Sequence, residues 1–512
     1  MKKIIFLSLI LSGLAVSGFA QTYQEKLDRM RERIEMKLDN QQKRVDLQFS
    51  NQLRRMWVQM QFQQPEDRPS IPEPTDPRVY NPATNIHQGE VELRVDPNFD
   101  PSPQYVESPV KDVKKNLIPR PAPSKEQDVA VNEFVKDRAK KMDREVRVFY
   151  FGKSLKMKYD SKMEISSPRT LSSNSIAEHW EGLEEAPHEF LIYQLTNEAK
   201  IMNLNDWGFA LLINETGKQI YPGDKNAQIM FNWFCLSKAG YMSTVSYERD
   251  QLYLMLPAYQ VLYGKSFLRG KDHKLYAIDL DGGNPQLSRA RVFQAAHPEA
   301  KKVMDFSVNS TPDFPESLRR KRVSFSYNNV NYVIPIDINE NTVAFYKTYP
   351  FVDLDIYLGA PLAQSAKRSM VDSLRRIVER IPAKGGRSRE MERVNLILRF
   401  VQTAFPYKSD NDQFGEEKYL FGDETLYYPY SDCEDRSVLF TYLVKEIMGL
   451  DVVGLLFPGH AATAVHFNGN VPGDYVKYQG KKYIICDPTY INADLGMMLP
   501  DVQGQSVKVV SL

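Results

Sequence analysis

Apolar side chains recur at steps of three, four and seven between Tyr23 and Met60, and charged side chains fill most of the positions between them. Apolar residues at this spacing share one face of an α-helix. The pattern predicts an amphipathic helix over residues 21–63. Such a helix can bind a protein partner or form a coiled coil, and it can equally dock on its own protein.

Prolines separate this helix from the rest of the chain. Thirteen of the 31 prolines lie between Pro65 and Pro123, where aliphatic runs are few. A segment without such runs cannot form an ordinary packed core. We therefore expect a Pro-rich linker over residues 64–128.

Helical and strand periodicities alternate between residues 129 and 283. Alternation around Gly152 predicts a β-hairpin over residues 146–159. The other expected elements are helices over 189–204 and 227–238, followed by strands over 251–256 and 274–280. This mixture predicts an α+β domain.

Helical spacing disappears from the next segment, residues 284–362. Alternating apolar and polar residues are separated there by Asn-rich turns, over 322–327, 331–336 and 342–346. The alternation predicts a small antiparallel β domain, and its sequence offers no candidate site.

The last region, residues 363–512, returns to helical spacing. Helices are expected over 363–381 and 388–405, a third helix begins at Cys433, and strands follow over 460–467 and 482–487. A chain of 512 residues is too long for one hydrophobic core. The fold class expected for the whole chain is multidomain α+β.

The N-terminus has the pattern of a secretory signal. Two lysines precede an apolar run from Ile4 to Val16, and small residues lead to a cleavage site after Ala20. No later apolar run reaches the roughly 18 residues that span a bilayer. We expect a signal peptide over residues 1–20 and an exported protein, periplasmic or extracellular, that is soluble after cleavage.

The charge balance points to no polyanionic partner. The 66 basic and 65 acidic residues leave a net charge of +1, and no basic tract is expected to bind such a partner. Nucleic acid is therefore not an expected partner.

Only three cysteines occur in a chain that is expected to be exported, namely Cys235, Cys433 and Cys486. An odd and sparse set is no disulfide framework, so at least one thiol is free. Cys433 stands between acidic residues in the first turn of an apolar helix, where a helix N-terminus favours a thiolate. Its position indicates chemistry, with the acidic neighbours facing solvent.

A thiol nucleophile needs a base and a group that orients the base. Two histidines follow Cys433, and they lie about 20 Å apart if they share one strand, at about 3.3 Å per residue. We favour His460 as the base, because the start of its strand can meet the end of a later strand that leads into Asp487. His466 is then a surface or hairpin residue.

Strand alternation assigns Cys486 to the opposite side of the sheet from Asp487, as a small core residue. A disulfide between Cys433 and Cys486 is the alternative. No HExxH or paired CxxC occurs, so neither a metal nor a cofactor is expected.

The order of these motifs resembles that of the transglutaminase-like superfamily. The matching motifs are Ser-Asp-Cys-Glu-Asp at residues 431–435, His460, and Asp-Pro-Thr at 487–489. The core of this superfamily is a circularly rearranged relative of papain-type cysteine peptidases. The resemblance covers residues 387–498. It implies that Gln402, in the Val-Gln pair at 401–402, approaches the site, and a polar residue that caps its helix or is exposed on it is the equally supported alternative. Ser431 replaces the usual glycine, and Ala462 stands where an aromatic residue is often found. The resemblance implies a transglutaminase-like (papain-like) C-terminal domain with an acyl-transfer triad of Cys433, His460 and Asp487.

Two functions follow as hypotheses. The first is an exported cysteine hydrolase or acyl transferase that cleaves or exchanges peptide or isopeptide amide bonds of a protein substrate through a thioester. The second is a non-catalytic envelope scaffold with a vestigial triad, which binds partners through its accessory parts.

An ungapped match places Asp224 on Cys433 and Gln251 on His460. Residues 129–283 are therefore expected to be a degenerate transglutaminase-like copy that cannot run thiol chemistry. Chance matching of two amphipathic helices is the alternative, and Cys235 is structural on either interpretation.

Overall fold

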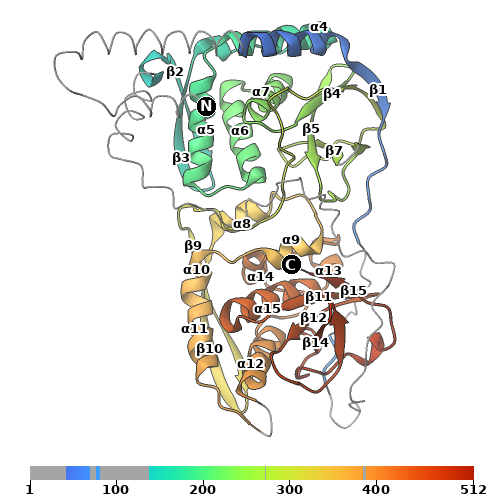
Figure 1. The fold of residues 1–512 in the computed structure, drawn as a ribbon. Coiled ribbons are helices and arrows are strands. Elements are labelled where there is room, and N and C mark those ends of the chain that lie inside the picture. Colours follow the sequence, from blue (N-terminus) through green and yellow to red (C-terminus); the bar gives the residue numbers. More distant parts are fainter. Residues whose placement is uncertain (1–41, 70–76, 81–137, 271–272, 385–387, 512) are drawn as a thin grey trace, which may run out of the picture.

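A computed structural model describes residues 42–69, 77–80, 138–270, 273–384 and 388–511 (Figure 1). Helices and strands are mixed throughout, so the chain is α+β, as predicted. The predicted signal peptide and most of the predicted linker lie outside the described residues, as does the first part of the predicted N-terminal helix. No helix among the described residues is long and apolar enough to cross a membrane.

The upper half in Figure 1 is built on a six-stranded sheet with the strand order β1-β8-β4-β5-β7-β6. Every neighbouring pair of strands in it is antiparallel. Its strands are β1 (Trp57–Gln61), β4 (Thr244–Glu248), β5 (Gln251–Ala258), β6 (Phe267–Arg269), β7 (Lys274–Ile278) and β8 (Arg289–Phe293). Beside the sheet lie a hairpin and four helices, which are β2 (Arg144–Tyr150), β3 (Lys153–Tyr159), α4 (Ser173–Glu185), α5 (Glu189–Ile201), α6 (Asp206–Ile220) and α7 (Lys225–Lys238).

The lower half is built on a five-stranded antiparallel sheet with the order β13-β14-β12-β11-β15. Its strands are β11 (Val452–Phe457), β12 (His460–His466), β13 (Tyr475–Tyr478), β14 (Lys481–Cys486) and β15 (Lys508–Val510). The helices are α10 (Gln364–Ala366), α11 (Asp372–Glu379), α12 (Arg389–Ala404), α13 (Asp410–Phe414), α14 (Gly422–Tyr427) and α15 (Cys433–Met448), with a π-helical turn, Lys367–Val371, between α10 and α11.

Both halves share one topology. Without β1, the order β8-β4-β5-β7-β6 of the upper sheet matches the order β15-β11-β12-β14-β13 of the lower sheet strand for strand, and all pairs are antiparallel. A buried helix precedes each sheet, α7 in the upper half and α15 in the lower half, and an aspartate caps each helix at its N-terminus. The upper sheet differs by the additional edge strand β1.

The predicted β domain over residues 284–362 does not form. Strand β8 belongs to the upper sheet, whereas the hairpin β9 (Leu318–Tyr327) and β10 (Val330–Asn339) packs against α10, α11 and α12 of the lower half. The strand predicted over 342–346 is the helix α8 (Glu340–Tyr346), because Asn339 caps its first turn by accepting from the amide of Asn341. A further short helix, α9 (Leu354–Gly359), lies between the halves.

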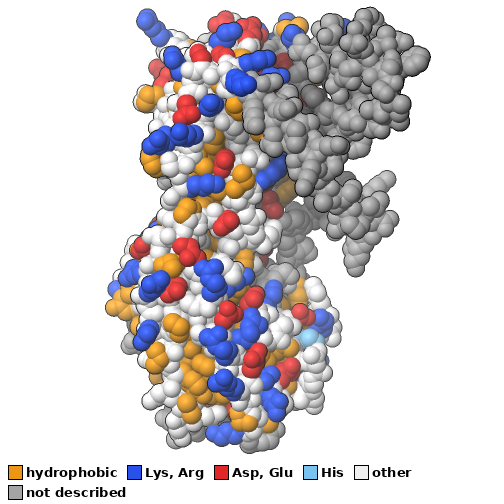
Figure 2. All heavy atoms as spheres, turned by 90° about the vertical axis from the view of Figure 1, so that its left-hand side faces the viewer, with side chains coloured by type: hydrophobic (Ala, Val, Ile, Leu, Met, Phe, Trp, Pro, Cys, Tyr) orange, Lys and Arg blue, Asp and Glu red, His pale blue; other side chains and the backbone are white. Residues whose placement is uncertain are grey.

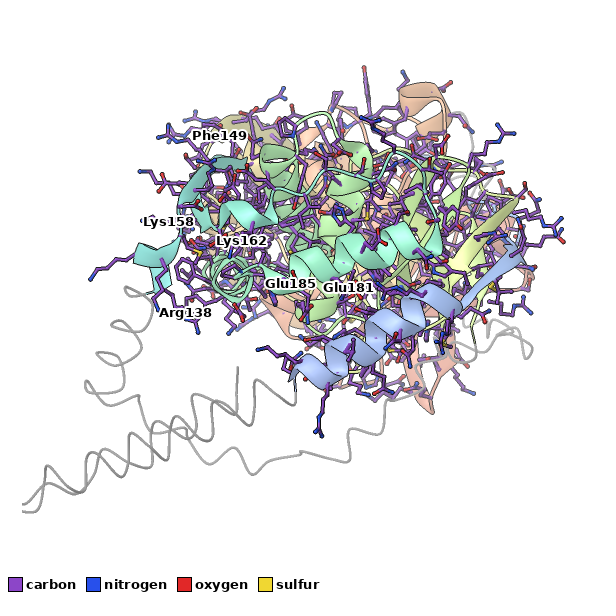
Figure 3. All side chains as sticks on the ribbon, turned by 90° about the horizontal axis from the view of Figure 1, so that it is seen from above. Arg138, Phe149, Lys158, Lys162, Glu181 and Glu185 are labelled. Atoms are coloured by element: carbon purple, nitrogen blue, oxygen red, sulfur yellow. The ribbon has the colours of Figure 1, made fainter. Side chains whose placement is uncertain are left out.

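The described part of the N-terminal helix, residues 42–55, docks on its own protein. Figure 3 shows it beside α4, where both oxygens of Glu181 accept from Arg54 at 2.6 and 2.7 Å. Phe49 and Leu53 are fully buried in the upper core. The prediction of helix up to residue 63 was wrong, because Trp57–Gln61 pairs with β8 as strand β1.

The first residues of the predicted linker are packed along both halves. The Glu66 carboxylate accepts from Lys274 of β7, and Arg68 donates to the carbonyl of Glu417 at 2.6 Å. Residues 62–69 therefore join the upper sheet to the loop that precedes α14.

Candidate active site

Cys433 is the first residue of α15 and is fully buried. Asp432 caps the helix, since its side chain accepts from the amide of Asp435 at 3.3 Å. The partial positive charge at this helix end favours a thiolate. The thiol donates to the Glu434 carboxylate at 2.9 Å, so a negative group also stands directly beside the sulfur.

The acidic residues around Cys433 are buried, and the expectation that they face solvent was wrong. Asp432, Glu434 and Asp435 are each 1% exposed. Asp435 accepts from the amide of Leu420 at 2.9 Å, and burial, with the neighbouring Asp432, raises its pKa well above the usual range. The Asp435 carboxylate therefore holds the backbone of the loop before α14 through this hydrogen bond.

Three carboxylates meet in this region. One oxygen each of Asp410, Asp432 and Asp435 lies within 4.8 Å of the others. Oxygen donors of this kind suit a hard cation such as Ca²⁺. Hydrogen bonds within the protein already engage them, because Asp410 accepts from the amide of Lys418 and the other two accept from each other's amides.

His460 and Asp487 form a buried pair. The Nε2 atom of His460 lies 2.7 Å from Oδ2 of Asp487, and the two side chains are 3% and 2% exposed. Thr489 and Tyr490 hold the second carboxylate oxygen through their amides at 2.8 and 3.0 Å. Within the described part of the chain, Nδ1 of His460 is buried and has no hydrogen-bond partner. One ring nitrogen is therefore oriented and the other is available for a proton.

Chain topology brings this pair to the same end of the sheet as Cys433. Helix α15 packs against both β11 and β12. Because β11 runs back from the end of α15, it finishes near the helix start, and His460 begins β12 after a two-residue turn. Arg436 lies one turn into α15, and burial lowers the pKa of its guanidinium to about 10. The negative charges of Cys433 and Asp487 both act on this guanidinium in the opposite direction.

Gln402 supports the site from behind. Its amide nitrogen donates to the carbonyls of Asp487, Tyr490 and Ala493 at 3.0, 2.8 and 3.0 Å, and its oxygen accepts from the amide of Asn492 at 3.2 Å. The side chain is 1% exposed. Of the interpretations left open by the sequence, the approach to the site agrees with the structure, because Gln402 is buried and holds the loop that carries Asp487, and it neither caps its helix nor is exposed on it.

The other two cysteines are structural. Cys235 and Cys486 are free and buried, and burial raises the pKa of both thiols. The alternative disulfide between Cys433 and Cys486 does not form. Cys486 belongs to the buried cluster that contains Leu439 and Leu443 of α15, so it faces the core on the helix side of the sheet. Asp487 follows the last residue of β14, where strand alternation no longer fixes its direction.

His466 lies at the far end of β12. Its Nδ1 atom is 2.9 Å from the carbonyl of Lys482, and the side chain is half-buried. This position agrees with the prediction of a hairpin residue away from Cys433.

The upper half shows what occupies the equivalent positions there. Asp224 caps α7 as Asp432 caps α15, so the residue that corresponds to Cys433 is Lys225 rather than the predicted Asp224. Gln251 begins β5 as His460 begins β12, and Asp279 follows β7 as Asp487 follows β14. The ungapped match missed a one-residue deletion between helix and strand.

These equivalent positions converge in space. The Lys225 ammonium lies 3.0 Å from Oδ1 of Asp279, and Gln251 donates to Asn226, the next residue of α7, at 3.4 Å. The shared topology therefore brings the helix start, the strand start and the post-strand aspartate together. In the upper half, Lys225 and Gln251 stand in place of the thiol and the imidazole, and Lys225 forms an ion pair with Asp279.

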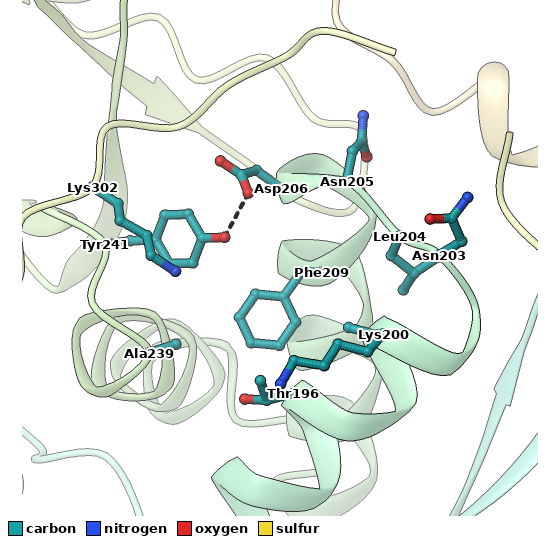
Figure 4. Close-up of a pocket in the computed structure, with 11 residues that line it drawn as sticks. Thr196, Lys200, Asn203, Leu204, Asn205, Asp206, Phe209, Ala239, Tyr241 and Lys302 are labelled. Carbon is teal, nitrogen blue, oxygen red and sulfur yellow. Dashed lines mark hydrogen bonds between the residues drawn. The ribbon is translucent and has the colours of Figure 1, made fainter. Parts of the chain in front are cut away.

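A cavity of about 320 Å³ lies elsewhere in the upper half, at the opposite end of α7 from Asp224 (Figure 4). Tyr241 donates to Asp206 at 2.6 Å in its wall. Its other lining residues are Thr196, Ala199, Lys200, Asn203, Leu204, Asn205, Phe209, Ala239 and Lys302. It is separate from the Cys433 site.

Comparison of the chain with models of protein families, with curated proteins and with solved structures found no match.

Proposed function

We propose that the protein is a transglutaminase-like cysteine hydrolase or acyl transferase that acts on amide bonds of a peptide or protein. The observation that carries the proposal is the buried His460–Asp487 pair, in which Nδ1 has no partner among the described residues. A triad requires this division of labour, with one ring nitrogen held by a carboxylate and the other left for the nucleophile. Cys433 starts the helix that packs on the same strand.

In the proposed reaction His460 takes the proton of the Cys433 thiol, and the sulfur attacks the carbonyl carbon of the amide. Backbone N–H groups at the start of α15 stabilise the oxyanion of the tetrahedral intermediate. Protonated His460 gives its proton to the leaving amine, which leaves a thioester on Cys433. Water or a second amine then attacks the thioester and releases an acid or a new amide.

The proposed location is outside the cytoplasm, after removal of the signal peptide predicted over residues 1–20. The supporting evidence is the sequence pattern of the N-terminus. The proposed identity of the upper half is a second copy of the same fold without the triad. Its strand order and the positions of Lys225, Gln251 and Asp279 support that identity.

The proposal is tested by alkylation of the full chain with iodoacetamide from about pH 5 to about pH 9, with the labelled cysteines located by mass spectrometry. Cys433 should react at least about tenfold faster than Cys235 and Cys486 below pH 7. His460→Ala should abolish this advantage, because the thiolate loses its counter-charge.

His466→Ala is the matched control, because it removes an imidazole from the same strand at the other end. This variant should keep the reactivity of Cys433. Slow labelling of all three cysteines in the parent protein, with no effect of His460→Ala, would contradict the proposal.

The second candidate function is a non-catalytic scaffold, and the burial of Cys433 favours it. Tyr419, in the loop before α14, is also buried, and burial together with nearby charges, among them those of Glu434 and Cys433, raises its pKa. Arg68 holds the same loop through the backbone of Glu417 and the carboxylate of Glu416. Slow and uniform labelling in the alkylation experiment is the result that the scaffold function predicts.

A further inference from the structure

Cationic side chains stack on aromatic rings where the hairpin β9–β10 meets α14. The Arg319 guanidinium lies 4.7 Å from the centre of the Tyr427 ring, and the Lys347 ammonium lies 4.6 Å from Tyr427 and 5.2 Å from Tyr428. The Lys321 ammonium lies 5.7 Å from the Phe405 ring. We call Arg319, Lys321, Lys347, Tyr427 and Tyr428 the cationic–aromatic surface.

The cations of this surface form no close ion pair. Among the described residues, no acidic side chain lies within 4.0 Å of the charged groups of Arg319, Lys321 or Lys347, whereas the neighbouring Arg320 pairs with Asp337 at 3.7 Å. Burial and the charge of Arg319 lower the pKa of Lys321 to about 8. Like charges held this close repel each other, and a bound anion would relieve the repulsion.

The expectation that the chain has no basic tract was wrong, because four consecutive basic residues stand at 319–322. Strand alternation divides them, with Arg319 and Lys321 opposite the buried Ile338 and Ile336, and Arg320 and Arg322 on the outer face. Figure 2 shows Lys and Arg side chains on this side of the lower half, interspersed with acidic and apolar ones.

The surface adjoins the start of α15. Phe405, which underlies Lys321, accepts through its carbonyl from Arg436 of α15 at 2.7 Å. Tyr407 forms a β-bridge with Ser431, two residues before Cys433. The surface is therefore connected through the backbone of residues 405–407 to the start of α15.

We propose that the cationic–aromatic surface binds an acidic segment of the polypeptide substrate, next to the bond that is cleaved or exchanged. That the bound segment is part of a substrate rests on the proposed function, whereas binding of an acidic segment itself needs no catalysis. Three cations spread over two elements and separated by tyrosine rings fit individual carboxylates along an extended chain. A nucleic acid backbone needs a longer continuous row of cations.

The test is fluorescence anisotropy of a labelled peptide of alternating glutamate and glycine, titrated with full-length protein that carries Cys433→Ala. Arg319→Gln combined with Lys321→Gln should raise Kd about tenfold or more and should reduce its salt dependence. Lys347→Gln, on a separate element, should weaken binding in the same direction, and it keeps the test decisive if the double variant does not fold.

Arg320→Gln is the matched control. It removes one charge from the same strand, but its side chain is 74% exposed on the other face, so Kd should stay within about twofold. Equal weakening by Arg320→Gln, or no peptide binding by the parent, would overturn the proposal. Tighter, Arg319-dependent binding of duplex DNA or of phosphatidylglycerol vesicles would overturn the assignment to a peptide. Since the protein in this test lacks the thiol, its outcome is independent of the alkylation result.

Discussion

The isosteric substitution Gln402→Glu should open the loop that carries Asp487. The Gln402 side-chain amide has two N–H groups, and they serve the carbonyls of Asp487, Tyr490 and Ala493. A carboxylate keeps the shape and offers no donor, so these buried carbonyls lose their partner. A buried polar group without a partner costs about 1–3 kcal/mol, and the loss of two donors therefore predicts about 2–6 kcal/mol.

This cost should depend on pH in a known direction. The site is 1% exposed, so burial will raise the pKa of the introduced carboxyl group. When that carboxyl group is protonated, it has one O–H donor and restores one hydrogen bond. The folded variant then binds a proton that the unfolded chain releases, so its stability is lost as pH rises through the raised pKa.

Hydrogen exchange with mass spectrometry measures the effect directly. Peptides that cover β14 and the loop after it should exchange about 30- to 20,000-fold faster in Gln402→Glu, since each 1.4 kcal/mol corresponds to about a tenfold change. Tryptophan fluorescence provides an internal reference, because all four tryptophans, Trp57, Trp180, Trp207 and Trp233, lie in the upper half.

Gln364→Glu is the control substitution, because Gln364 is exposed at the start of α10. It should leave exchange of the Asp487 loop unchanged. If Gln402→Glu exchanges in this loop at the rate of the parent protein at pH 8, the clamping role of Gln402 is refuted.

Two further substitutions test buried carboxylates. Asp423 is fully buried, and burial raises its pKa from 3.8 to about 7, so the parent protein should lose up to about 4 kcal/mol as pH rises from about 4 to about 7. Asp423→Asn should remove this loss, and urea unfolding midpoints that keep the parent's pH dependence would contradict it. Glu434→Gln removes the negative charge 2.9 Å from the Cys433 sulfur, and it should raise the alkylation rate of Cys433 at pH 7 about tenfold while leaving Cys235 unchanged. A slower rate at Cys433 would show that Glu434 assists the thiolate.

Local sequence determined most of the secondary structure around the site. Helices over 388–405 and from Cys433 and strands over 460–467 and 482–487 correspond to α12, α15, β12 and β14, because apolar spacing and capping residues act within a few residues of each other. The pairing of His460 with Asp487 also followed from the sequence, since each stands at the end of a recognisable strand.

Pairing between strands that are distant in the sequence determined secondary structure that the local pattern did not predict. Residues 57–61 continue a helical pattern and still form β1, because β8 offers an edge that satisfies their backbone hydrogen bonds. The predicted β domain divides between two sheets for the same reason.

The sequence by itself determined which residue types stand at the start of α15, at the start of β12 and after β14. Only the tertiary structure decided that acidic neighbours of Cys433 are buried, that Gln402 holds the loop of Asp487, and that Lys225 rather than Asp224 matches Cys433. Burial and hydrogen bonding between distant segments depend on how the whole chain packs, and spacing along the sequence carries no information about those partners.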